Sequence, residues 1–354
     1  MNVTDPTSLY RVRDGAYAAD LLIAAVTEFD VFTWLAVHGP ARAEVLRAAL
    51  RWAERPADVL LTYAAALDLV SRDLAAGDVV ELTALAREHF VAGSAYDLRT
   101  YYGSLAERPA AREFARVLRT DEPAPWASAI SDGDADRAGS GNGGARDWSG
   151  RLADVEFASR ITAAMDARGA FLAPALARAT ADLPVGRLLD VGGSSGIYAA
   201  AVLEQHPTAS AAVFERAPVD QAARTLLAER GQNDRIDVVT GDMFVDPLPT
   251  AFDVHLYSQV LHDWDRSRVE HLLAASYRAL PPGGWLLDHD THVDADKTGP
   301  LPVAEYSALL MHSTPGKCWS TGELAAIAEA VGYIDITVRP TAADRSVLLA
   351  RVPR

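Results

Sequence analysis

Two side chains that can exchange protons or bind metals follow one apolar run. The stretch HLYSQVLHDW, residues 255–264, carries His262 and Asp263 near its end. A neutral imidazole, with a pKa of about 6.5, can act as a general base near neutral pH. Imidazole and carboxylate are also common metal ligands, and a buried histidine can simply hydrogen-bond to backbone. Whether His262 is a general base, a metal ligand or a core residue depends on what the rest of the chain places around it.

A second chemical signal is the glycine-rich turn LLDVGGSSG at residues 188–196. Glycines between a strand and a helix let the backbone approach a ligand closely, and this spacing differs from the G-x-G-x-x-G of a dinucleotide site. Glu215 ends the next predicted strand, where a carboxylate can accept hydrogen bonds from both ribose hydroxyls. GDMF at 241–244 follows the third strand and offers a carboxylate and apolar surface to a purine. A nucleoside site is the interpretation that joins these signals.

The elements that must hold these residues alternate from residue 187 onward. Apolar runs of strand length are each followed by an amphipathic helical segment, and IDITVRPT and RSVLLARV close the series as a predicted hairpin. This alternation predicts an α/β fold, with a parallel sheet covered by helices on both faces. The first hundred residues show helical spacing and end in a predicted wing within GDVVELTALAREHF, which is the outline of a winged helix.

Three segments are therefore expected. Residues 1–105 form a helical, winged-helix domain, residues 106–184 form helices with a mobile Gly-rich loop at 121–146, and residues 185–354 form the sheet domain. The stretch DHDTHVD at 288–294 is rich in metal-binding types, but strand alternation turns His289 away from its neighbours. A solvated strand end is the interpretation favoured for it.

Composition excludes some functions. The formal net charge is −15, and residues 41–75 hold five arginines against five acidic residues, so binding to nucleic acid or to an anionic membrane surface is disfavoured. Cys318 is the single cysteine, and the N-terminus has no signal-peptide pattern. A cytoplasmic protein is expected.

The motifs LLDVGGSSG, FE, GDMF, LHDW and PPGGWLL occur in an order that resembles S-adenosylmethionine-dependent methyltransferases of the caffeic-acid O-methyltransferase type. The likeness spans most of the chain. It implies a Rossmann-like catalytic domain behind an N-terminal dimerisation domain, S-adenosylmethionine as cofactor, and a small aromatic hydroxyl compound from secondary metabolism as substrate. The cofactor contacts that it implies are Asp190, Gly192, Gly193, Glu215, Asp242, Met243, Phe244, Ser258 and Trp264.

The resemblance also implies that His262 is the general base and that Asp290 orients it, with Asp263 beside them. One departure is Trp319, which stands where the family usually has a second orienting glutamate. His312, which the common pattern lacks, opens an alternative. His262, Asp263 and His312 could hold Fe(II) or Zn(II), as in metal-dependent C-methyltransferases of 2-oxo acids.

The remaining expectations concern the substrate and the partners. Trp148, Leu152 and Met165 lie on helices before the sheet, where the family builds its substrate pocket, and His312 and Trp319 are further substrate candidates. A homodimer through residues 1–100 is expected. The non-catalytic alternative is a methyltransferase-like regulator whose winged helix binds DNA, and the charge balance of residues 41–75 argues against it.

Overall fold

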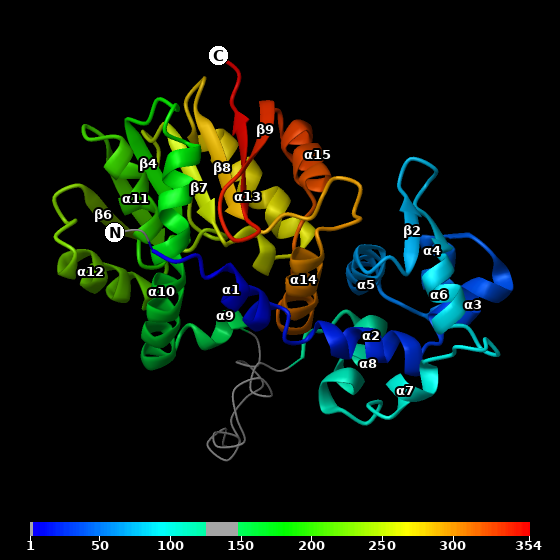
Figure 1. The fold of residues 1–354 in the computed structure, drawn as a ribbon. Helices are drawn as coiled ribbons and strands as arrows, with labels where there is room; N and C mark the ends of the chain where they lie inside the picture. Colours follow the sequence, from blue (N-terminus) through cyan, green and yellow to red (C-terminus); the bar gives the residue numbers. More distant parts are fainter. Residues whose placement is uncertain (1–2, 125–147) are drawn as a thin grey trace. The chain divides into compact units, whose positions relative to one another are not determined.

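A computed structural model describes residues 3–124 and 148–354 (Figure 1). The described residues form two compact units. Residues 3–124 and 292–322 make up one, here called the helical unit, and residues 148–291 and 323–354 make up the other, the sheet unit.

Helices make up most of the helical unit. They are α1 (Thr7–Asp14), α2 (Ala18–Thr27), α3 (Val31–His38), α4 (Ala43–Leu50), α5 (Glu54–Ala66), α6 (Ala84–His89), α7 (Arg99–Gly103), α8 (Pro109–Thr120) and α14 (Leu301–Ser313). Three short antiparallel strands pair in the order β1 (Ala41–Arg42), β3 (Val79–Leu82) and β2 (Val70–Asp73). β3 lies within the stretch that was predicted to hold the wing. The segment after it forms α6, and the Thr83 hydroxyl caps this helix by accepting a hydrogen bond from the Ala86 N–H.

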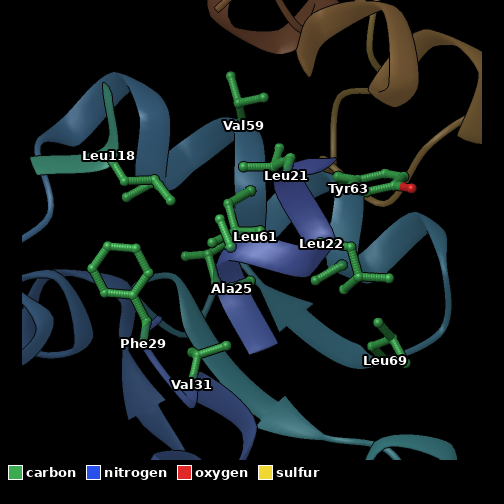
Figure 2. Close-up of a cluster of buried hydrophobic side chains, with 14 of the residues drawn as sticks. Leu21, Leu22, Ala25, Phe29, Val31, Val59, Leu61, Tyr63, Leu69 and Leu118 are labelled. Carbon is green, nitrogen blue, oxygen red and sulfur yellow. The ribbon is translucent and has the colours of Figure 1, made fainter. Parts of the chain in front are cut away.

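The core of the helical unit forms around α2, which is apolar on nearly all sides and is therefore buried. Leu21, Leu22 and Ala25 of α2 belong to the same cluster of buried side chains as Val59 and Leu61 of α5 (Figure 2). The same core includes Ala304, Ala308 and Met311 of α14, a helix that the chain reaches only after most of the sheet is complete.

The sheet unit holds, among its described residues, a seven-stranded sheet in the order β6-β5-β4-β7-β8-β10-β9. The strands are β4 (Arg187–Val191), β5 (Ser210–Glu215), β6 (Ile236–Thr240), β7 (Val254–Ser258), β8 (Trp285–Asp290), β9 (Ile334–Pro340) and β10 (Ser346–Arg351). Neighbouring strands from β6 to β8 run parallel, and β10 pairs antiparallel with both β8 and β9. The α/β class and the closing hairpin are thus as predicted.

Helices cover both faces of this sheet (Figure 1). The helices of this unit are α9 (Trp148–Arg151), α10 (Val155–Ala179), α11 (Ile197–Gln205), α12 (Val219–Glu229), α13 (Arg266–Ala279) and α15 (Thr321–Val331), with the short 3₁₀ helix η3 (Leu261–Asp263) after β7. The chain moves from β4 toward β6 in one direction and from β7 toward β8 in the other. The strand order therefore reverses between β4 and β7. In sheets of this kind, ligands bind at the carboxyl ends of the two strands on either side of the reversal.

The division of the chain differs from the three predicted segments. Of the predicted middle segment, 106–184, α8 belongs to the helical unit while α10 packs against α11 in the sheet unit. Residues 292–322 leave the sheet unit and join the helical unit, because the apolar face of α14 completes that unit's core. Most of the predicted Gly-rich loop, residues 125–147, lies outside the described residues.

Among the described helices, none is by itself both long and apolar enough to cross a membrane. One bent pair, Thr7–Thr27 with Val31–His38, meets the criteria for length and composition when its two parts are taken together.

Candidate active site

His262 and Asp290 form the central pair of the sheet unit. Ser258, the last residue of β7, pairs with His289 of β8, so the ends of these two parallel strands lie next to each other. His262 follows in η3, and its Nδ1 lies 2.6 Å from Asp290 Oδ1. Because a carboxylate only accepts hydrogen bonds, Nδ1 carries the proton and Nε2 is the basic nitrogen of the neutral ring. Both side chains are buried.

The charges around His262 set its proton affinity. Burial lowers the pKa of His262, but the carboxylates of Asp290 and Asp263 outweigh it, so this pKa lies above its ordinary range. Asp263 Oδ1 is 3.6 Å from His262 Nε2, which is too far for a hydrogen bond. Burial raises the pKa of Asp263. His262 is thus a histidine held in one orientation within a negative environment.

The glycine turn after β4 is shaped by Asp190. A Cβ atom at Gly193 would lie 2.4 Å from Asp190 Cγ, so the carboxylate occupies the space that any other side chain would need. Gly192 has a φ of +67°, and its Cβ would lie 3.2 Å from Val260. Burial raises the pKa of Asp190 to about 7, and among the described residues its oxygens have no partner at hydrogen-bonding distance and angle. An unpaired buried carboxylate beside an open backbone turn is the kind of group that a bound ligand satisfies.

Glu215 stands at the end of β5, beside the same turn. Its carboxylate accepts hydrogen bonds from the Ser194 N–H at 3.2 Å and from the Arg216 N–H at 2.9 Å. Burial raises the pKa of Glu215 to about 7, since desolvation outweighs these two donors. The sequence placed a ribose-binding carboxylate at this position, and the structure brings it to the glycine turn.

An aromatic wall follows β6. Phe244 and Trp264 pack edge to face with ring centroids 4.6 Å apart, and the Arg268 guanidinium lies 4.9 Å from the Trp264 ring. Asp242 Oδ1 accepts a hydrogen bond from the Phe244 N–H at 2.9 Å, which fixes the start of the wall. A Cβ at Gly192 would lie 3.8 Å from Met243 Sδ, so this wall reaches the glycine turn. The structure brings these residues to the turn, and their contact with a purine nucleoside stays a prediction.

The stretch 288–294 is not a solvated strand end, and that prediction was wrong. Asp288, His289, Asp290 and His292 are all buried. His289 does point away from Asp290, but it faces protein, with Nδ1 2.9 Å from Ser258 Oγ. Ser258 was expected near the cofactor. Its hydroxyl forms a hydrogen bond with the His289 ring.

His312 lies in the helical unit, where its Nε2 is 2.8 Å from Glu113 Oε2. Its ring stacks on Tyr17 with a centroid distance of 4.8 Å. Burial lowers the pKa of His312 even though Glu113 opposes this. Within the described part of the chain, no group of three or more His, Cys, Asp or Glu side chains is arranged to hold a metal ion. The metal alternative, with His262, Asp263 and His312 as ligands, thus finds no support.

Trp319 is buried in the helical unit, with the Lys317 ammonium 4.8 Å from the centre of its ring. Among the other substrate candidates, Leu152 and Met165 are partly exposed near and on α10, and Trp148 begins α9.

Two contacts were missed from the sequence. Glu113, the partner of His312, lies 199 residues away from it, and no local pattern links them. Arg268 stands four residues after Trp264, a spacing that could have indicated their contact at the start of α13.

Comparison with known proteins agrees with this geometry. Residues 127–334 match the model of the O-methyltransferase domain family. The chain is 31% identical over 90% of its length to a 3-hydroxy-5-methyl-1-naphthoate 3-O-methyltransferase of Streptomyces sahachiroi, 86% of which is covered. It is 30% identical over 84% of its length to the N,N-dimethyltransferase OxyT of Streptomyces rimosus, 81% of which is covered. A solved O-methyltransferase family 2 protein from Planctomyces limnophilus, in complex with apigenin, superposes with a TM-score of 0.81 at 31% identity, covering 98% of this chain and 96% of that one.

The chain belongs to the O-methyltransferase family. It is an S-adenosylmethionine-dependent enzyme that methylates a hydroxyl group of a small molecule, as the motifs predicted, and the regulator hypothesis is set aside.

Proposed function

We propose that His262 is the general base of this methyltransferase and that Asp290 orients it. The observation that carries the proposal is the 2.6 Å contact between His262 Nδ1 and Asp290 Oδ1 inside a buried site. With the proton of the neutral ring held on Nδ1, the Nε2 lone pair can accept the proton of a substrate hydroxyl. Phenols have a pKa near 10 and are weak nucleophiles when neutral, so base assistance is worth about 10²–10⁴-fold in rate.

Asp290 gives His262 two properties that a base needs. It fixes the ring orientation, and its negative charge stabilises the imidazolium that forms when the proton arrives. The pKa of His262 lies above its usual range, which brings it closer to that of a phenol and makes the proton transfer less uphill. Asp263 adds to this effect through its charge.

The cofactor site combines the glycine turn, Glu215 and the aromatic wall of Phe244 and Trp264. S-adenosylmethionine supplies an electrophilic methyl group on a sulfonium when it is bound. Glu215 would accept hydrogen bonds from the ribose hydroxyls, and Asp242 would accept from the adenine amino group. Gly192 and Gly193 leave the backbone accessible where side chains would block it.

The substrate is proposed to be an aromatic hydroxyl compound of secondary metabolism. Three relatives carry names of this kind: the naphthoate enzyme, a mitomycin 6-O-methyltransferase and a tetracenomycin 8-O-methyltransferase. Leu152 and Met165 of the sheet unit are proposed to contact the substrate, and the same role for Trp148, His312 and Trp319 stays a prediction from the sequence.

Product analysis with the His262→Ala variant tests this function. Wild-type enzyme with methyl-labelled S-adenosylmethionine should label hydroxynaphthoates or related phenols on oxygen, as mass spectrometry of the product would report. His262→Ala should lower kcat by about 10²–10⁴-fold and leave S-adenosylhomocysteine binding unchanged. His38→Ala, at an exposed histidine, is the matched control. Near wild-type turnover of His262→Ala, or label on nitrogen or carbon alone, would contradict the proposal.

The enzyme is further proposed to be a homodimer through residues 1–100. Leu9, Val12, Val37, Tyr96 and Tyr101 of this region are between 70% and 77% exposed, and a second copy of the chain could cover such apolar side chains. Light scattering should give about 76 kDa, twice the 37.9 kDa of the chain. The double variant Leu9→Glu/Tyr101→Glu should lower that mass. A wild-type mass of one chain at micromolar concentration would refute the dimer.

A further inference from the structure

Hydrogen bonds to one oxygen hold the Asp290 carboxylate at the end of β8. Its Oδ1 accepts from the His262 Nδ1–H at 2.6 Å, from the Thr291 backbone N–H at 2.8 Å and from the Thr291 hydroxyl at 3.3 Å. Thr291 directly follows Asp290 in the chain, so two of these donors move together with the strand end. The direction in which the carboxylate faces His262 therefore depends on where the end of β8 lies.

His289 fixes this strand end from the other face of the sheet. Successive side chains of a strand point to opposite faces, so the His289 ring projects away from Asp290. The ring is fully buried, and its Nδ1 lies 2.9 Å from the hydroxyl of Ser258, the last residue of β7. Its Nε2 lies 3.2 Å from the hydroxyl of Thr341, the first residue after β9. A neutral imidazole donates through one nitrogen and accepts through the other, and a hydroxyl can do either, so both contacts can be satisfied at once.

This bridge of hydroxyl, imidazole and hydroxyl, made by Ser258, His289 and Thr341, joins three neighbouring segments. Ser258 pairs with His289 where β7 and β8 run parallel. On the other side of β8, His289 pairs with Val347 of β10, the strand that follows the loop of Thr341. The Tyr198 ring packs against the middle of the bridge, with its centroid 5.3 Å from that of the His289 ring. The side chains of the bridge therefore connect the same segments as the backbone pairing, at the end of the sheet where the base pair lies.

Thr341 is the outer end of the bridge. It lies 52 residues beyond His289 in the chain and is half-buried, whereas the other two members are buried. Its backbone N–H donates to the Arg345 carbonyl at 2.9 Å, which closes the loop between β9 and β10 and fixes the place of the hydroxyl. Without that hydroxyl, one nitrogen of a buried ring would lose its partner, and a movement of the ring or its strand would relieve the loss. Because the ring belongs to β8, such a movement displaces the next residue, Asp290.

We propose that His289 and Thr341 are positioning residues of the methyl transfer. Their bridge to Ser258 holds the end of β8 in place. The Asp290 carboxylate at that end then faces His262 Nδ1, as the general-base role proposed for His262 requires, and the inference rests on that proposed role. Neither His289 nor Thr341 exchanges a proton with the substrate, and both act through Asp290.

Variants of Thr341 test this inference, because this residue is the least buried member of the bridge. Thr341→Val keeps the shape of the side chain and removes the hydroxyl. It should lower kcat about tenfold, while KM for both substrates stays within about twofold. Thr341→Ala removes the same hydroxyl and should have the same effect. Thr341→Ser keeps the hydroxyl and should retain kcat within about twofold of the wild type.

The pH profile gives a second readout. Burial and Arg168 of α10 lower the pKa of His262, while Asp290 of β8 and Asp263 of η3 raise it. A displaced Asp290 carboxylate raises it less, so the acid limb of the kcat profile should move to lower pH in Thr341→Val and stay in place in Thr341→Ser.

Two further measurements separate a positioning role from a general loss of stability. Proton NMR of the wild type should show a downfield resonance for the His262 Nδ1 proton, absent in His262→Ala, and Thr341→Val should shift or broaden it. In the Asp290→Asn background, Thr341→Val should change kcat by less than about twofold, since no carboxylate is left to orient. Thr180→Val is the matched control, because it removes a buried hydroxyl that donates to the Leu176 carbonyl at 3.0 Å. It should lower the melting temperature and leave kcat, the acid limb and the resonance unchanged.

A wild-type kcat, acid limb and resonance in Thr341→Val and Thr341→Ala would overturn this inference alone. A loss of kcat of about tenfold that persists in the Asp290→Asn background would also overturn it, because the bridge would then act on something other than Asp290. A His262→Ala variant that turns over normally would overturn the proposed function as well.

Discussion

His262 Nδ1 and Asp290 Oδ1 lie 2.6 Å apart, although 28 residues separate them in the chain. The contact follows from the sheet, since β7 and β8 are parallel neighbours and both residues stand just beyond or at the strand ends. The proposed base and its orienting carboxylate are therefore positioned by the pairing of β7 with β8.

The pH profile should depend on Asp290. The pKa of His262 is raised by the Asp290 and Asp263 carboxylates, so wild-type kcat should rise with pH through a value above the ordinary imidazole range. Asp290→Asn removes a raising charge, so the acid limb should move to lower pH while maximal kcat falls by about 10²–10⁴-fold. Stopped assays of kcat between pH 5 and 9 would measure both, and an unmoved acid limb would show that Asp290 does not act on His262.

Cofactor affinity should rise with pH near neutrality. Burial raises the pKa of Glu215 to about 7, so the carboxylate that is proposed to accept hydrogen bonds from the ribose is fully ionised only above that pH. Calorimetry from pH 6 to 8 should show that the wild type binds the cofactor more tightly as pH rises. Glu215→Gln should bind the cofactor about 1–3 kcal/mol more weakly, and its affinity should rise less with pH. Part of the rise should remain, since the pKa of Asp190 is also about 7. A pH-independent wild-type affinity would contradict this account.

Asp58 should be a major determinant of stability in the helical unit. It accepts hydrogen bonds from Arg72 at 2.7 Å, from Lys297 at 2.9 Å and from Lys317. Burial alone would raise the pKa of Asp58, but these three cations hold it well below its usual range. Asp58→Asn should cost about 3 kcal/mol at pH 7, because buried cations lose their counter-charge.

The pH dependence of that cost has a definite sign. A depressed pKa stabilises the fold above the unfolded value of about 4, and this contribution is lost as pH falls through the folded pKa. Denaturant unfolding of wild type and Asp58→Asn at pH 7 and pH 3 should therefore show a gap that shrinks at the lower pH. A gap that stays constant would mean that the charge is not the cause.

Metal removal should leave activity unchanged. His312 Nε2 is engaged by Glu113 within the helical unit, so it is not set up as a ligand. His312→Gln should lower stability through the lost pairing, and preincubation with a chelator should not alter kcat. About one equivalent of iron or zinc in protein purified without chelator, lost in the His312 variant, would overturn this expectation.

Local patterns predicted much of the fold, because the period of the apolar residues identified the alternation of strands and helices. The pairing of His262 with Asp290 was predicted by the family resemblance and not by periodicity. The parallel pairing of β7 with β8 gives the physical reason why these two residues lie close together.

Long-range contacts could not be predicted in the same way. The stretch DHDTHVD is mostly polar, yet residues 288–293 are buried, because Ser258 and Thr341 from neighbouring segments hydrogen-bond with His289. Residues 292–322 join the helical unit because the apolar face of α14 packs into that unit's core. That choice is made by tertiary packing, which periodicity does not encode.

The placement of α14 has a consequence for how the protein emerges from the ribosome. Ala304, Ala308 and Met311 belong to the same core as Leu21 and Phe114, so the helical unit lacks part of its interior until residue 311 has been synthesised. At about 5–20 residues per second, roughly ten to forty seconds pass between the end of α8 and that point. An early fragment of residues 1–124 would expose this apolar gap throughout, and for that interval it is a natural client for a chaperone.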